Sequence, residues 1–334
     1  MMDRTRRSVV GGLAAALLAP RAAAADDDWP ARPVRVVVPF SAGGAADAFG
    51  RFYADALSTA FGKQFYVENK VGAGGLIATE DIARAKPDGY TLMVSGIPTH
   101  VLGPAMNKNV SFDPMRDFTH IAFFGGAPNV FVVHPALGVR SFAEFMARVK
   151  RESSGIEYVS AGVGAVGNWV ADYLAARANI KLVHIAYKGG ANAVLDLIAG
   201  HVRAGMLTYS SVSEHIRAGA LLPLAVTASA RLAQMPDVPT FRELGYPEMV
   251  ATTWFALSGP AGLPSDIVTR LNHDVVKAME GSQMRQQIAQ EAIEVTAMSP
   301  AEVTRYFQSE IDKWQPVIAR VMSADLGANN MGAK

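Results

Sequence analysis

The sequence predicts an α/β fold of two similar domains that face each other across a ligand cleft. Strand-like and helix-like segments alternate along the chain, as in α/β units. The segment 34–38 (VRVVV) is a continuous β-branched run, which favours a parallel strand buried on both faces. Glycine-rich loops join a strand to a helix at 36–50 and again at 158–170. Two such loops predict equivalent positions in two domains, with helix N-termini turned toward a shared cleft.

The first series of elements comprises strands at 34–38, 65–68, 90–95 and 120–124 and a helix after the segment PFSAGG. The apolar residues of that helix recur at helical spacing, which predicts one buried face. They are Phe49, Phe52, Tyr53, Ala56, Leu57 and Phe61.

The second series begins with a strand at 130–133 and continues to residue 207. Its expected elements are a helix at 141–151, strand 156–160, helix 166–178, strand 182–187, helix 191–199 and strand 202–207. Ser141 with Glu144 forms a capping-box pattern, and Ser299 with Glu302 repeats it at the start of a last helix over 300–321. Residues 323–334 are small and polar and are expected to form a C-terminal tail.

The composition is that of a globular protein, with 50% hydrophobic and 18% charged residues in a chain of 334. A formal net charge of +1 gives no reason to expect a nucleic-acid partner. Cysteine is absent, which excludes disulfides and thiolate metal sites, and the histidines show no metal-ligand spacing. We therefore expect no metal and no cofactor.

The first 25 residues have the pattern of an export signal. A positively charged start precedes an apolar run from Val9 to Ala19, and small residues lead into DDDWP. That run is shorter than the roughly 20 residues that span a bilayer. The Arg6-Arg7 pair favours the twin-arginine route, with the general secretion route as the alternative. Either route predicts a periplasmic protein.

The loop Gly162-x-Gly164-x-x-Gly167 has the spacing of a dinucleotide-binding fingerprint but lacks the other required parts. No acidic residue ends the next strand, where one would hold the ribose. Lys188 leaves an NADP site as an alternative. A phosphate-binding P-loop is excluded, because Asn168-Trp169 stand where Lys and Ser or Thr are required. The remaining interpretation is an anion site built from backbone N–H groups at helix N-termini.

Several motifs together resemble one known family, the extracytoplasmic solute receptors of the tripartite tricarboxylate transporters, often called Bug proteins. The resemblance runs from about residue 29 to residue 321, with the motifs in register. They are WPARPVRVVVPFSAGGAADAFGR, VENKVGAGG, KPDGYTLMVS, VHIAYKGG, PLAVTASARLAQMPDVPTFRELGYP and WFALSGPAGLPSDIVTRLN.

The resemblance implies a fold like the type II periplasmic binding proteins, with two α/β domains that close on a small carboxylate. Domain one would comprise residues 29–127 and 228–322, and domain two residues 128–227. It also implies that the two glycine-rich loops grip one ligand carboxylate. The candidate binding residues on the first loop are Phe40, Ser41, Ala42, Gly43, Gly44 and Asp47, and on the second Ser160, Ala161, Gly162, Gly164 and Asn168.

Further candidates lie outside these loops. Asp47 stands at a helix start and is expected to order its loop or a bridging water rather than to meet the anion. Trp254-Phe255 could form a wall of the site or belong to the core. Family loops lining the cleft are matched by Thr99, His100, Tyr187, Leu207 and Thr208.

The sequence departs from the family pattern on the far side of the expected pocket. Leu207 stands where many members have an acid, Ala165-Val166 replace hydroxyl-bearing residues, and Asn168 replaces a frequent histidine. The pocket is therefore expected to be less polar than usual, which favours a less polar carboxylate over amino acids or citrate.

We therefore predict a monomeric periplasmic receptor that binds a small organic carboxylate and delivers it to a tripartite tricarboxylate-type transporter or to a sensor. It is expected to catalyse no reaction. The alternatives are an enzyme acting on a small acid, dependent on NADP or on His100, and a structural protein of the envelope.

Overall fold

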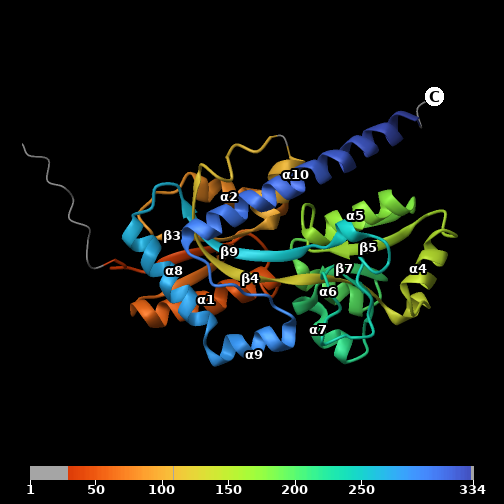
Figure 1. Cartoon of the computed structure of the whole chain (residues 1–334), viewed down its shortest axis with the longest axis horizontal. Coiled ribbons are helices and arrows are strands. Elements are labelled where there is room, and N and C mark those ends of the chain that lie inside the picture. The colour runs from red at the N-terminus through yellow and green to blue at the C-terminus, as the bar shows by residue number, and fades with distance from the viewer. Residues whose placement is uncertain (1–28, 108, 332–334) are drawn as a thin grey trace, which may run out of the picture.

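Strands and helices alternate through the computed structural model, which describes residues 29–107 and 109–331 (Figure 1). The predicted α/β class is confirmed, and the expected export signal lies outside the described residues. The strands are β1 Val34–Val38, β2 Phe65–Asn69, β3 Thr91–Gly96, β4 Phe118–Val133, β5 Ile156–Ser160, β6 Leu182–Ala186, β7 Ala204–Thr208, β8 Leu222–Val226 and β9 Thr252–Pro260.

The helices lie between these strands and after the last of them. They are α1 Ala45–Phe61, α2 Leu76–Ala83, α3 Gly103–Met106, α4 Phe142–Val149, α5 Val166–Ala178, α6 Gly190–Ile198, α7 Tyr209–Arg217, α8 Ser265–Met279, α9 Ser282–Glu291 and α10 Pro300–Met331. Short helical turns occur at η1 Ala73–Gly75, η2 Pro98–Leu102, η3 Pro135–Leu137 and η4 Pro247–Met249.

The strands form two lobes, and some of the strands run through both. The order is β2-β1-β3-β9-β4-β7-β5-β6, with β8 also paired to β4. We call the elements packed on β2, β1, β3 and β9 the first lobe, and those packed on β7, β5, β6 and β8 the second lobe. In each lobe the strands followed by helices pair in parallel: β1 with β2 and β3, and β5 with β6 and β7. Their carboxyl ends therefore reach one edge of each sheet.

The strands β4 and β9 connect the lobes. Residues 118–128 of β4 pair with β9, and residues 129–133 pair with β7. Figure 1 shows β4 and β9 running side by side from one lobe to the other. Strand β4 thus changes partner between residues 128 and 129.

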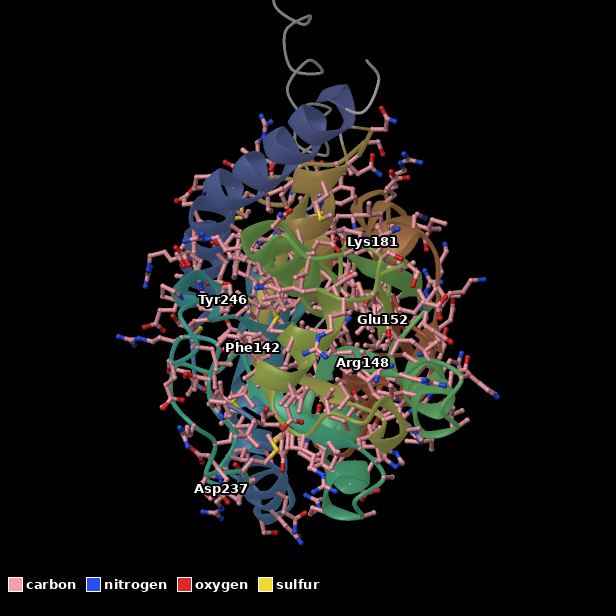
Figure 2. All side chains as sticks on the ribbon, turned by 90° about the vertical axis from the view of Figure 1, so that its right-hand side faces the viewer. Phe142, Arg148, Glu152, Lys181, Asp237 and Tyr246 are labelled. Carbon is pink, nitrogen blue, oxygen red and sulfur yellow. The ribbon has the colours of Figure 1, made fainter. Side chains whose placement is uncertain are left out.

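The return crossing lies later than residue 228. Phe142 on α4 of the second lobe packs edge-on against Phe241 and Tyr246, with ring centroids 5.6 and 6.2 Å apart. Figure 2 shows this end of the molecule, with Phe142 beside Tyr246. The Ala251 N–H donates to the carbonyl of Thr227. Residues 228–251 thus pack on the second lobe, and the chain returns along β9.

Helix α10 bridges the lobes on the side away from α6 and α7 (Figure 1). Phe307 lies under Trp254 of β9, with ring centroids 4.7 Å apart, and Trp314 meets Trp169 of α5 at 4.7 Å. The helix continues to Met331, into most of the segment expected as a tail. Among the described residues, no helix is both long and apolar enough to cross a membrane.

Candidate ligand-binding site

Four helix N-termini converge on one cavity between the lobes, which we call the inner cavity. Helix α1 comes from the first lobe and α5, α6 and α7 from the second. None of the four has a side-chain hydrogen bond capping its N-terminus. The residues at these termini that line the cavity are Gly44, Ala45 and Ala46, then Ala165, Val166 and Gly167, then Gly189 and Gly190, and finally Thr208 and Ser211.

The first loop is held in shape by Asp47, the third residue of α1. Its carboxylate accepts hydrogen bonds from the Gly43 N–H and the Arg51 side chain, both at 2.9 Å, and from the Asn69 amide at 2.9 Å. Burial acts to raise the pKa of Asp47, but the hydrogen bonds from Arg51, Gly43 and Asn69 and the Arg51 charge lower it below its ordinary value. Asp47 is therefore an ionised group that orders the loop, and it does not line the cavity.

The second loop repeats this arrangement with a neutral residue. Asn168 is the third residue of α5, and its Oδ1 accepts from the Gly164 N–H at 3.1 Å, as Asp47 accepts from Gly43 four residues earlier. The Asn168 amide nitrogen donates to the Tyr158 hydroxyl at 3.1 Å and to the Asp172 carboxylate at 2.8 Å. Both loops thus fold around the third residue of their helix, which leaves the earlier N–H groups directed out of the helix end.

Ser160 and His184 support the second loop from behind. The Asn168 amide nitrogen also lies 3.3 Å from Nδ1 of His184, whose other ring nitrogen is Nε2. That Nε2 lies 2.7 Å from the Ser160 hydroxyl, which in turn accepts from the Gly162 N–H. Burial lowers the pKa of His184, in agreement with a neutral ring.

The rest of the inner cavity is neutral. Its volume is about 40 Å³. Of the described residues that line it, none has an ionisable side chain. Polar atoms come from Asn129, whose amide donates to Thr253 Oγ1 at 2.8 Å, and from Thr208 and Ser211, whose hydroxyls are 2.8 Å apart. The remaining walls are Phe40, Pro98, Ala161, Met206, Leu207 and Phe255.

The two lobes touch each other around this cavity. The Ser41 N–H of the first lobe donates to the carbonyl of Lys188 in the second at 2.9 Å. Gly189 approaches so closely that a Cβ there would overlap Ser41 Oγ. Gly74 of the first lobe lies against Val163 of the second, where an added Cβ would be 2.5 Å from the Val163 carbonyl oxygen. The structure thus shows the lobes closed on each other, and glycines make the close approach possible.

The structure brings some of the residues expected at the site to the cavity wall and places others behind it. Phe40, Gly44, Ala161, Leu207 and Thr208 line the inner cavity, as does Phe255. The others shape the loops, lie at the contact between lobes, belong to the core or, in the case of Gly162, Gly164 and Tyr187, line a larger neighbouring cavity. They are Ser41, Ala42, Gly43, Asp47, Thr99, His100, Ser160, Gly162, Gly164, Asn168 and Tyr187.

Thr99 and His100 lie in the interior of the first lobe. His100 is fully buried, its Nδ1 pairs with Thr99 Oγ1 at 3.0 Å, and its ring packs against Phe118 and Phe307 with centroids 4.6 and 5.4 Å apart. Burial lowers the pKa of His100 well below its ordinary value. Trp254 is likewise a core residue, whose indole N–H donates to Glu310 at 3.0 Å. Pro98, rather than its two successors, reaches the cavity.

The starts of α6 and α7 were not predicted as equal partners of the two glycine loops. Gly190 and Ser211 line the cavity from these helices, and Asn129 and Thr253 line it from β4 and β9. A signal was present, because β6 and β7 are each followed directly by a helix, and ligands in α/β proteins bind at the carboxyl ends of parallel strands. The described residues contain no group of three or more His, Cys, Asp or Glu side chains that could hold a metal.

The comparisons with known protein sequences agree on one family of receptors. The model of the tripartite tricarboxylate transporter family receptors matches residues 49–322. Protein BugT of Bordetella pertussis is 31% identical over 318 residues, covering 95% of this chain and 98% of its own. A UPF0065 protein from the tcbD-tcbE intergenic region of a Pseudomonas species is 32% identical over 315 residues, covering 94% of each chain.

Solved structures agree with these matches. The periplasmic binding protein BugD superposes with a TM-score of 0.84 at 28% identity, covering 88% of this chain and 98% of that one. MatC (Rpa3494) from Rhodopseudomonas palustris, with bound malate, gives 0.83 at 29% identity, covering 87% and 100%. Rpa4515 of R. palustris, with adipate, gives 0.83 at 28%, covering 88% and 98%. The fold is therefore that of these periplasmic binding proteins, and the chain belongs to the tripartite tricarboxylate transporter family of receptors.

Proposed function

We propose that this receptor binds a small organic carboxylate in the inner cavity and closes its two lobes around it. The carboxylate is held by backbone N–H groups of the two glycine-rich loops, assisted by the starts of α6 and α7. One moving body consists of residues 29–127 and 252–322. The other consists of residues 128–251. They move about the two shared strands, and ligand contact with both lobes favours the closed state.

The observation that carries this proposal is the convergence of four uncapped helix N-termini on one cavity that has no ionisable side chain. Each N-terminus presents unpaired N–H groups and roughly half a positive charge. Hydrogen bonds to a charged group contribute about 1.5–3 kcal/mol each. Four of them would supply about 6–12 kcal/mol before the costs of association, and micromolar affinity needs about 8. The main chain alone can therefore hold an anion.

The same cavity disfavours ligands that carry a positive charge. Leu207 is buried and lines the wall, and no carboxylate of the lining residues faces a ligand ammonium group. An amino acid would leave its ammonium group desolvated without an anionic partner, which is costly. The ligand we propose is an acid with no cationic group. The adipate and malate bound by the two R. palustris proteins are carboxylates of this kind.

The place and partners of the receptor are part of the proposal. Residues 1–25 would direct export to the periplasm, where the loaded receptor meets a membrane transporter of the tripartite tricarboxylate type or a sensor. The enzyme alternative gains no support, because His100 is buried in the core and does not line the inner cavity.

Pairs of acids and their neutral amides test the proposal. The purified receptor is heated with each member of a panel of aliphatic, hydroxy and aromatic acids at millimolar concentration, and with the amide of each acid. At 100 times its dissociation constant, a ligand that binds only the folded state adds about 2.7 kcal/mol of stability. At least one acid should raise the unfolding temperature while its amide does not. Equal shifts from acid and amide, or no shift from any acid, would refute the carboxylate site.

A further inference from the structure

A second, larger cavity lies directly beside the inner one. This outer cavity has a volume of about 590 Å³ and lies between the turn 72–76 and α3 of the first lobe and the second glycine-rich loop of the second lobe. Phe40 and Ala161 line both cavities. The two spaces are therefore neighbours, and these two residues lie at their common boundary.

Phe40 is fixed at its backbone, and its ring reaches toward the turn 72–76. The Phe40 carbonyl accepts from the Asn69 side chain at 2.9 Å, and the next residue, Ser41, donates to Lys188 across the cleft. The tip of the ring is close to the turn at Gly75, where an added Cβ would lie 3.5 Å from Phe40 Cζ. The ring thus lies between the turn 72–76 and the inner cavity.

The inner cavity alone is too small for most organic acids. Its 40 Å³ corresponds to room for about three water molecules. We place the carboxylate group and the carbon atoms next to it in that space. A longer ligand whose carboxylate lies at the helix N-termini must extend past Phe40 and Ala161 into the outer cavity.

The walls of the outer cavity suit an apolar group. They consist largely of glycine, alanine and aliphatic side chains, among them Leu76, Met106 and Val163. Val163 is 60% exposed. Lys188 also lines the outer cavity and is exposed to solvent. An apolar group that covers these residues would gain the free energy of removing apolar surface from water.

We propose that the outer cavity takes the apolar tail of the bound acid. This inference rests on the carboxylate site proposed above. The receptor is then one for monocarboxylates with an apolar tail, and Phe40 selects among them by the size of the passage that it leaves. Each methylene buried in the outer cavity should tighten binding roughly fourfold.

A series of unbranched monocarboxylates from acetate to octanoate tests this by isothermal titration calorimetry. The variant Ala186→Phe fills the outer cavity from the end of β6, because Ala186 lines the outer and not the inner cavity. The matched control is Ala143→Phe, an exposed alanine on α4 at the far end of the second lobe (Figure 1). In the wild type and the control, affinity should rise from propionate to octanoate. In Ala186→Phe the short acids should bind as in the wild type and the gain with length should disappear.

Three results would overturn the proposal. The first is an affinity that stays level beyond propionate in the wild type. The second is the same length dependence in Ala186→Phe and Ala143→Phe. The third is tighter binding of α,ω-dicarboxylates than of monocarboxylates of equal length, which would assign Lys188 rather than apolar burial as the determinant. In all three cases acids still bind, so the carboxylate site would stand, whereas a chain that binds no acid would refute both proposals.

Discussion

Replacing Gly74 by alanine tests whether the lobes must touch for a ligand to bind. Gly74 has a φ of +66°, and a Cβ there would lie 2.5 Å from the carbonyl oxygen of Val163 on the other lobe. Real Cβ atoms essentially never approach an oxygen so closely, so Gly74→Ala cannot reach this closed arrangement without a shift. Overpacking of this kind costs about 1–3 kcal/mol, which corresponds to roughly 5- to 150-fold weaker binding.

Gly62→Ala is the matched control for this variant. Gly62 has a φ of +63°, and an added Cβ meets no described atom within 4 Å. Both variants should lose about 1 kcal/mol of folding stability, because alanine is disfavoured at positive φ. Only Gly74→Ala should lose affinity for an acid that stabilises the wild type, as measured by isothermal titration calorimetry. Equal affinities in the two variants would refute the link between lobe contact and binding.

Two further predictions concern the loops and the core. Asn168→Ala removes the acceptor of the Gly164 N–H, so acid binding measured by calorimetry should weaken by about 1 kcal/mol, or roughly fivefold. Asp47→Asn keeps an oxygen acceptor for the Gly43 N–H and should weaken acid binding less. A larger loss of affinity in Asp47→Asn than in Asn168→Ala would contradict this account of the loops. Burial lowers the pKa of His120 from 6.5 to about 4. The unfolded state therefore binds more protons between these values, and the free energy of unfolding should fall by about 1.5 kcal/mol from this group as the pH drops from 6.5 to 5. Urea unfolding at stepped pH should show a shallower dependence in His120→Gln than in the wild type, and identical slopes would contradict this assignment.

Local patterns in the sequence predict the elements of the fold well. The helix expected at 166–178 matches α5, because its start and its apolar spacing are both local signals. The strands expected at 120–124 and 130–133 are instead one strand, β4. The glycines, proline and asparagine of 125–129 favour a turn in isolation, but pairing with β9, and with β7 at Asn129, keeps them within one strand. Tertiary pairing of this kind is not encoded within a short window of sequence.

The candidate site was predicted in part for a related reason. The two glycine-rich loops are visible as motifs, and each contributes residues to the inner cavity. The starts of α6 and α7 join them only because β6 and β7 take neighbouring places around β5, which depends on strand order. Thr99 and His100 match the family motif but are buried, since the turn at Gly75 lies between Thr99 and the outer cavity. Which side of a loop faces a cleft depends on packing that a motif does not specify.

The central claim is that one carboxylate is held by main-chain N–H groups from both lobes at once. Amide ¹H–¹⁵N NMR of the receptor titrated with a bound acid measures this directly, because a hydrogen bond to an anion shifts an amide proton downfield. The resonances of Ala45 and Ala46 on α1 and of Val166 and Gly167 on α5 should shift together and saturate at the same acid concentration. Saturation with shifts at only one of these two helices, or at neither, would contradict the claim.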